Sequence, residues 1–119
     1  MAAPRVLVVD DNADAVDTFR VMLQSHGHEV KVAYDGAQAL QAIDKYNPDV
    51  VLLDLGLPMI SGCDVARFIK GRLGTVMPRI VAVTGRGAEK DRKHTAEAGF
   101  DLHLVKPVNE AQLLQAIAV

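Results

Sequence analysis

The stretch that indicates the fold most directly reads DVVLLD, at residues 49–54. Its four consecutive apolar residues place apolar side chains on both faces of a strand. A strand of this kind suits the centre of a parallel sheet that helices cover on both sides. Asn47-Pro48 ends a helical pattern just before it, and Asp54 closes the strand. Residues 49–53 therefore predict a central parallel strand with a carboxylate at its carboxyl end.

Strand-like and helix-like segments alternate on both sides of this stretch. Further strands are predicted at residues 6–9, 29–33, 78–83 and 101–105. Helical patterns separate or follow them, and five such strand–helix units predict an α/β fold with a doubly wound five-stranded parallel sheet in the order 2-1-3-4-5. The 119 residues form one expected domain, 1–119, and are too few for an eight-fold barrel.

Two of the predicted helices carry specific expectations. A helix is predicted to begin at Ser61, with an apolar stripe of Val65, Phe68 and Ile69. Residues 88–98 contain good helix formers but almost no large apolar side chain. That helix is expected either to dock loosely on the sheet, as a moving or partner-binding element does, or to be an ordinary solvated helix.

Composition narrows the class of protein. The formal net charge is −2, and aromatic residues make up 4% with no Trp, which disfavours a general nucleic-acid-binding role. Cys63 is the single cysteine, so no internal disulfide framework exists and a reducing, cytoplasmic location is expected. The longest apolar run is far shorter than a membrane span, and the N-terminus does not resemble a signal peptide.

Chemically active residues stand at the carboxyl ends of four predicted strands, where open α/β sheets bind ligands. They are Asp10 and Asp11 after the first strand, Asp54 after the third, Thr84 after the fourth and Lys106 after the fifth. Carboxylates about 4–5 Å apart repel each other by about 3–4 kcal/mol per pair at an effective dielectric constant near 20. Three such carboxylates predict a hard divalent cation, Mg²⁺ or Mn²⁺. Each motif alone is an ordinary turn, cap or strand end; the set is what indicates a site.

With the cation in place, one aspartate remains as a nucleophile for a phosphoryl group. Lys106 and the Thr84 hydroxyl are suited to hold phosphoryl oxygens. At this point the chain resembles the receiver domain of response regulators in two-component signalling, which has a flavodoxin-like (βα)5 fold. The motifs that carry the resemblance are VVDDN at 8–12, LLDLGLP at 52–58, AVTG at 82–85 and LVKP at 104–107.

The resemblance implies a role for each site residue. Asp54 would accept a phosphoryl group from a phosphohistidine on a histidine kinase or histidine phosphotransfer protein. Asp11 would ligate Mg²⁺ directly, together with Asp54 and the backbone carbonyl of Gly56, and Asp10 would act largely through water. Lys106 would pair with the phosphoryl group, and the Lys106–Pro107 peptide would be cis.

The resemblance also implies a switch. Thr84 would move toward the phosphoryl group, and His103, at the position of a switching aromatic residue, would follow. Such an imidazole would make the coupling pH-dependent. The surface formed by the helix at 88–98, the strand at 101–105 and the helix after Asn109 would then change conformation, as a shift between two populations. Gly56 and Arg86 occupy positions that tune the lifetime of the phosphoryl group.

Alternatives from other classes remain. A Mg²⁺-dependent aspartyl-phosphate phosphohydrolase usually carries a second carboxylate where this chain has Gly56. A flavin mononucleotide carrier would need a Ser/Thr-rich phosphate loop in place of Asp10-Asp11-Asn12. A DNA-binding role for the basic residues of 86–94 is disfavoured by interleaved acidic residues. We therefore expect a signalling module and not a conventional enzyme, with no nucleic acid or membrane partner of its own. Parts of the chain resemble receivers attached to hybrid sensor histidine kinases, so a kinase or output domain outside this chain is an open expectation.

Overall fold

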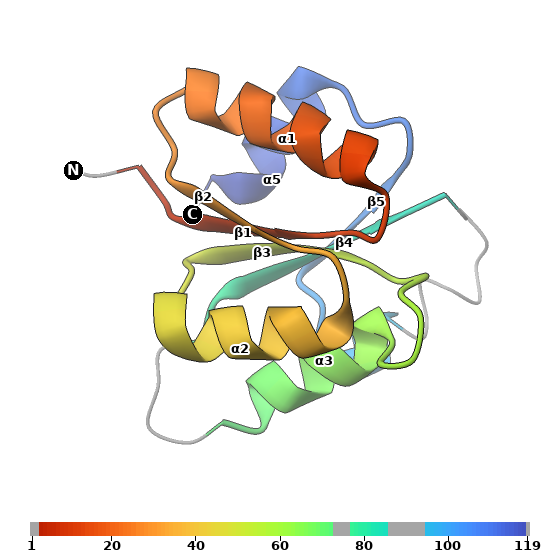
Figure 1. Ribbon diagram of the computed structural model, residues 1–119. Helices are drawn as coiled ribbons and strands as arrows, with labels where there is room; N and C mark the ends of the chain where they lie inside the picture. The colour runs from red at the N-terminus through yellow and green to blue at the C-terminus, as the bar shows by residue number, and fades with distance from the viewer. Residues whose placement is uncertain (1–2, 73–76, 86–94, 119) are drawn as a thin grey trace.

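Five parallel strands form a single sheet in the order β2-β1-β3-β4-β5 in the computed structural model, which describes residues 3–72, 77–85 and 95–118 (Figure 1). The predicted doubly wound parallel sheet is confirmed. β3 lies between β1 and β4, which is the central position that its apolar sequence predicts. The strands are β1 (Val6–Val9), β2 (Val30–Ala33), β3 (Val50–Asp54), β4 (Arg79–Thr84) and β5 (Leu102–Val105).

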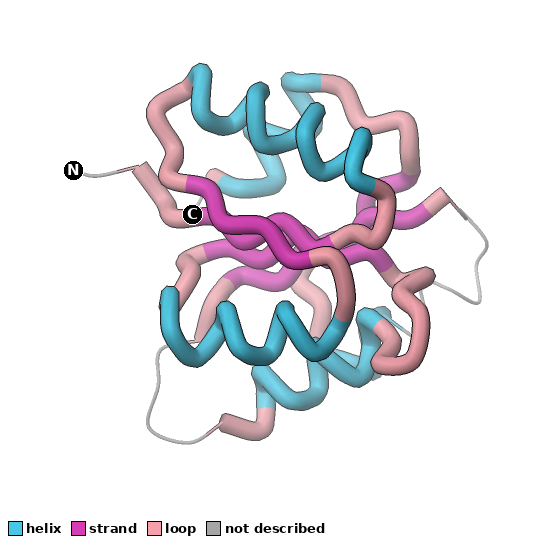
Figure 2. Tube along the Cα trace, viewed as in Figure 1, coloured by secondary structure: helices cyan, strands magenta, loops and turns pink. Residues whose placement is uncertain are grey.

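Helices cover both faces of the sheet, as the tube in Figure 2 also shows. α1 (Ala13–Ser25) and α5 (Glu110–Ile117) lie on one face, and α2 (Gly36–Tyr46) and α3 (Gly62–Lys70) lie on the other. Residues 95–98 are also helical; residues 86–94, which include Arg86 and most of the helix predicted at 88–98, lie outside the described residues. None of the described helices combines the length and apolar content that a membrane span requires.

Side chains alternate between the two faces of the sheet along each strand, and they form one hydrophobic core on each face. In β1, Val6 and Val8 point to the α1 and α5 side, whereas Leu7 and Val9 point to the α2 and α3 side. All four residues of β1 are buried. A strand that is covered on both faces must be apolar throughout, so the same burial explains why β1 and β3 read as continuous apolar runs.

Side chains with oxygen acceptors start the helices at the expected positions. Asn12, Asp35, Ser61 and Asn109 each accept a hydrogen bond from a backbone N–H in the first turn of α1, α2, α3 and α5, respectively. At α5, Gln112 also bonds back to the Asn109 N–H, which completes a capping box. These caps fix where the chain leaves the carboxyl edge of the sheet and turns into each helix.

The predicted apolar stripe of α3 is wrong at one residue. Val65 and Ile69 are fully buried, but Phe68 is 42% exposed. Ala66 lies against the core on the other side of Val65, and it takes the buried position in place of the aromatic ring. A stripe of i, i+1 and i+4 buries these three residues, and the i+3 position falls at its solvent edge.

Candidate functional site

The strand ends bring the predicted site residues to one edge of the sheet. Asp10 directly follows β1, Asp54 and Thr84 end β3 and β4, and Lys106 directly follows β5. Because all five strands are parallel, these ends share an edge. The register places Asp54 opposite Val83, so Asp54 and Thr84 end adjacent strands one step apart.

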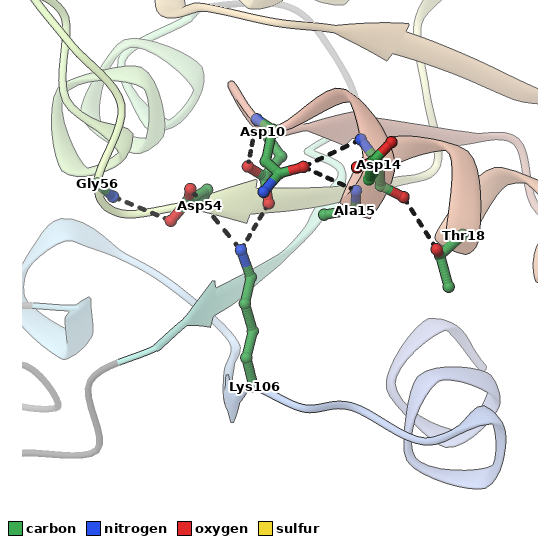
Figure 3. A network of polar contacts seen from close by, with 8 residues as sticks. Asp10, Asp14, Ala15, Thr18, Asp54, Gly56 and Lys106 are labelled. Carbon is green, nitrogen blue, oxygen red and sulfur yellow. Dashed lines mark hydrogen bonds and ion pairs between the residues drawn. The ribbon is translucent and has the colours of Figure 1, made fainter.

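Lys106 lies between two of the carboxylates (Figure 3). Its Nζ donates a hydrogen bond to Asp10 Oδ2 at 2.7 Å and stands 4.0 Å from Asp54 Oδ2. The lysine side chain retains 30% of its exposure, whereas the Asp10 side chain retains 3%. The ammonium group therefore compensates the most buried carboxylate and remains accessible from solvent.

Asp10 uses both of its oxygens for contacts within the protein. Oδ1 accepts a hydrogen bond from the Asn12 N–H at 2.9 Å, and Oδ2 accepts the one from Lys106. A charge-assisted hydrogen bond to a buried carboxylate is stronger than a neutral one. Asp10 is thus held in a fixed orientation by the start of α1 on one side and by Lys106 on the other.

The surroundings of Asp54 affect the protonation of its carboxylate. Its Oδ1 accepts a hydrogen bond from the Gly56 N–H at 3.0 Å. Burial is the largest effect, and it raises the pKa of the Asp54 carboxyl above its ordinary value. The hydrogen bond from Gly56 lowers this pKa by less than burial raises it, and the charge of Asp10 raises it further. A carboxylate with a raised pKa is more basic, which favours its use as a nucleophile.

The pKa of Lys106 is raised as well. Burial by itself would lower the pKa of the ammonium group, but the hydrogen bond to Asp10 and the charges of Asp54 and Asp10 outweigh it. The ammonium group consequently stays charged over the physiological pH range. A permanent positive charge between Asp10 and Asp54 suits the binding of a further anionic group at Asp54.

Asp10, Asp11 and Asp54 each present an oxygen, and these three oxygens lie within 4.8 Å of one another. Asp11 is exposed and Asp54 is partly buried, so both can be reached from solvent. Three carboxylates with one nearby ammonium group leave excess negative charge. All-oxygen donors of this kind fit a hard divalent cation such as Mg²⁺. Gly56, whose carbonyl is the expected further ligand, is exposed beside Asp54.

Of the two expected switch residues, Thr84 lies at the end of β4 and His103 lies within β5. Thr84 is 4% exposed, and its carbonyl accepts a hydrogen bond from the Lys106 N–H at 2.7 Å. His103 pairs with Ala82 across β4 and β5, and its Nδ1 lies 3.3 Å from Thr95 Oγ1. The His103 Nε2 is buried and has no hydrogen-bond partner among the described residues.

The Lys106–Pro107 peptide bond is cis.

Sequence reasoning misses two contributors to the site. The backbone of Asn12 holds Asp10, a role that the turn-and-cap interpretation of Asp10-Asp11-Asn12 points toward without specifying. Gly62 approaches the Asp54 carbonyl so closely that a Cβ atom would collide with it. No pattern in the sequence indicates which backbone Gly62 meets, because the contact depends on the angle at which α3 leaves the loop.

Comparisons with known proteins agree with this geometry. The sequence profile of the family described as response regulator receiver domain matches residues 6–118. The chain is 34% identical over 117 residues to the transcriptional regulatory protein PrrA of Mycobacterium tuberculosis. That match covers 98% of this chain and 49% of PrrA, so the chain spans about half the length of the curated relatives it matches.

Solved structures show the same fold. The chemotaxis protein CheY4 of Vibrio cholerae has a TM-score of 0.90 at 28% identity, covering 98% of this chain and 100% of that one. The receiver domain of a sensor histidine kinase from Pseudomonas aeruginosa has a TM-score of 0.87 at 29% identity, covering 98% and 95%. The latter was solved with a magnesium ion coordinated in its active site cleft.

Proposed function

Because this chain belongs to the response regulator receiver domain family, we propose that it accepts a phosphoryl group in a two-component relay. The phosphoacceptor is Asp54, and the donor is a phosphohistidine on a histidine kinase or histidine phosphotransfer protein. The observation that carries the proposal is the arrangement of Lys106 between Asp10 and Asp54, beside three carboxylate oxygens within 4.8 Å.

The transfer moves one phosphoryl group between two nucleophiles. A carboxylate oxygen of Asp54 attacks phosphorus, the P–N bond to the donor imidazole breaks, and the imidazole leaves with the electron pair and takes up a proton. The Gly56 N–H, bonded to Oδ1, fixes the orientation of the carboxylate. The Lys106 ammonium group, 4.0 Å from Oδ2, is positioned to compensate the charge that the phosphoryl oxygens bring.

The donor set supports a Mg²⁺ ion, with Mn²⁺ as an alternative. Asp11, Asp54 and the Gly56 carbonyl are the proposed direct ligands. Asp10 acts through water, which agrees with the engagement of both its oxygens by Asn12 and Lys106. When bound, the ion supplies positive charge that offsets the repulsion between the carboxylates and an incoming phosphoryl group.

The proposed readout is a change on the surface formed by the segment 88–98, β5 and α5. The Thr84 hydroxyl donates a hydrogen bond to a phosphoryl oxygen. His103, whose Nδ1 lies 3.3 Å from Thr95 Oγ1, then changes its contact with Thr95. Replacing His103→Ala should leave phosphorylation of Asp54 intact and reduce the phosphorylation-dependent NMR shifts on β5 and α5. Unchanged shifts in this variant would count against a switching role for His103.

The proposed setting of the module is the cytoplasm, as a signalling domain that catalyses only its own phosphotransfer and slow dephosphorylation. Residues 1–119 are proposed to form one domain. Attachment to a kinase or to an output domain, as in a hybrid sensor kinase, is proposed from family resemblance alone. PrrA, which is named a transcriptional regulatory protein, extends to about twice the matched length.

Intact-mass spectrometry after incubation with acetyl phosphate tests the phosphoacceptor. The wild type should gain one phosphoryl group with Mg²⁺ and none with EDTA, and Asp54→Asn should gain none. Asp64→Asn, which removes an exposed carboxylate outside the site, is the matched control and should behave as the wild type. An adduct that persists in Asp54→Asn would overturn the assignment.

Rapid hydrolysis would hide the adduct, so beryllofluoride provides a second measurement. With Mg²⁺, it should shift the amide resonances of Thr84 and Lys106 in the wild type but not in Asp54→Asn. A wild type that shows neither an adduct nor these shifts would exclude the proposed chemistry.

A further inference from the structure

A hollow of about 720 Å³ opens at the amino edge of the sheet, opposite the edge that holds Asp54. Parallel strands begin at this edge, and the hollow is lined by residues at or just before the starts of four of them. Arg5 precedes β1, Asp49 precedes β3, Arg79 begins β4 and Asp101 precedes β5. Asn47 after α2, Lys70 at the end of α3 and Arg72 just beyond it complete the polar lining.

Positive charge dominates this hollow. Four cationic side chains line it, those of Arg5, Lys70, Arg72 and Arg79, against two carboxylates, Asp49 and Asp101. Each carboxylate already accepts a backbone hydrogen bond of 2.8 Å, from Arg5 and from Ile80, respectively. The protein as a whole has a formal net charge of −2, so this edge departs in sign from the rest of the molecule.

Contacts with the protein hold the three guanidinium groups in place. Arg79 Nε donates to the Ala116 carbonyl at 2.8 Å, and Arg5 donates to the Asn47 carbonyl. Arg72 lies 3.2 Å from Asp44, whose side chain is 59% exposed. An ion pair with so exposed a partner contributes little stability, so Arg72 can exchange Asp44 for a stronger anion. The site is thus partly preorganised for a charged ligand.

Apolar surface lies beside these charges. Ile43, Pro48 and Pro78 are buried and line the hollow, and Met77 is 39% exposed there. The adaptable methionine side chain and the rigid proline rings together offer an apolar surface for a flat ring. A volume of this size falls within the usual range for small-molecule sites, which combine apolar walls with a few charged groups.

We propose that this hollow binds a small phosphorylated molecule with a flat apolar body, of which nucleoside phosphates are representative. One planar guanidinium group can bind two phosphate oxygens at once, so Arg72, whose present partner Asp44 is exposed, is suited to the phosphate end. Lys70 adds a mobile ammonium group, and the wall of Pro48, Pro78 and Met77 takes the ring. The site is separate from Asp54 and does not depend on the proposed phosphotransfer.

Calorimetric titration with adenosine diphosphate in EDTA tests the proposal on the unphosphorylated protein. We expect a Kd of about 0.1–1 mM, and weaker binding as salt is raised. The double variant Lys70→Glu/Arg72→Glu should bind at least tenfold more weakly. Arg67→Glu is the control: it reverses one positive charge on α3 outside the hollow, as each replacement of the double variant does within it, and it should bind as the wild type.

Amide NMR shifts locate the ligand. Adenosine diphosphate should shift Ile43, Met77, Arg79 and Asp101 and leave Asp10 and Lys106 unchanged. Binding confined to the Asp54 edge, or no binding at several millimolar ligand, would overturn the proposal. So would equal affinity for inorganic phosphate, since the apolar wall would then contribute nothing.

Discussion

Two glycines near Asp54 differ sharply in the space around them. A Cβ atom on Gly62 would collide with the Asp54 carbonyl oxygen and lie 3.1 Å from the Leu55 Cα. On Gly56 the nearest atom would be Asp54 Oδ1 at 3.7 Å, an ordinary contact. The absence of a side chain at Gly62 is therefore what lets α3 begin directly against the end of β3.

Replacing Gly62→Ala should lower the free energy of unfolding by about 2 kcal/mol, because backbone atoms must move to admit the methyl group. The displacement falls on the backbone of Asp54, so phosphorylation by acetyl phosphate should also slow. Urea denaturation and intact-mass kinetics measure the two effects. Gly56→Ala is the control and should change the stability by less than about 0.5 kcal/mol; equal losses in both variants would refute the steric explanation.

Met59 combines full exposure with a left-handed backbone. Its φ is +67°, and its side chain makes no buried contact, with a relative exposure of 102%. A side chain in this region costs about 1 kcal/mol or more, which glycine avoids, although glycine loses part of that gain through its freer unfolded state. We expect Met59→Gly to raise the free energy of unfolding by about 0.5 kcal/mol.

Met59→Ala is the matched comparison, since alanine keeps the Cβ atom that causes the strain. Its stability, also measured by urea denaturation, should equal that of the wild type. A glycine variant no more stable than the alanine variant would show that the left-handed backbone at residue 59 costs no more than the unfolded-state freedom that glycine adds.

At the scale of single residues, sequence identifies the charged groups better than their contacts. The positions of Asp10, Asp11, Asp54 and Lys106 at one edge follow from their places at strand ends. That Lys106 bonds Asp10 at 2.7 Å and lies farther from Asp54 does not follow, because it depends on side-chain conformations within the assembled site.

Among the elements, α1 has a start that is hydrogen-bonded to the site through one residue, Asn12. The Asn12 Oδ1 accepts hydrogen bonds from Asp14 N and Ala15 N, at 3.0 and 3.2 Å, while the Asn12 N–H holds Asp10. Asn12→Ala removes the cap and should cost about 1 kcal/mol of stability in thermal or urea unfolding. Asn12→Ser, which retains a capping oxygen, should lose less than half as much; an equal loss would argue against the cap.

Element starts are more predictable than the faces of short helices. Asn12, Asp35 and Asn109 are recognised as start signals because a side-chain acceptor there satisfies otherwise unpaired N–H groups. The exposure of Phe68 is not predicted, because a nine-residue helix offers few turns with which to define its buried stripe. Tertiary packing, which buries Ala66, determines which face of α3 meets the core.

At the scale of the whole molecule, the ionisation of Tyr46 makes the stability of the fold depend on pH in the alkaline range. Its hydroxyl donates to the Glu29 carbonyl at 3.0 Å, and Arg5 lies over its ring. Burial, and then the charge of Glu29, raises the pKa of Tyr46 to about 12. The folded state holds the proton of the Tyr46 hydroxyl more tightly than the unfolded state does. The contribution of this group to the free energy of unfolding is therefore complete below pH 10 and is lost as the pH rises toward 12.

The tyrosinate absorbance of a Tyr34→Phe variant, in which Tyr46 is the one remaining tyrosine, measures this pKa. Circular dichroism at each pH identifies the folded range. Glu29→Gln in the same background should lower the midpoint toward 10. A midpoint near 10 in folded protein, unchanged by Glu29→Gln, would contradict the expected shift.

The sheet order is the feature that sequence predicts most fully. Five apolar runs separated by helical patterns leave few arrangements open, since crossovers are right-handed and each strand must be covered on its apolar faces. The hollow at the amino edge is not predicted, because its cationic residues are spread from Arg5 to Arg79 and meet only when the loops before the strands converge.

Among the described residues, the charges at the two edges of the sheet differ in sign, which favours an electric dipole along the strands. Three carboxylates and one ammonium group mark one pole, and four cationic side chains with two carboxylates mark the other. A partner with a basic surface would be turned toward the Asp54 pole during diffusion, before any contact forms. The association rate with such a partner should therefore depend on ionic strength more steeply than a net charge of −2 would produce.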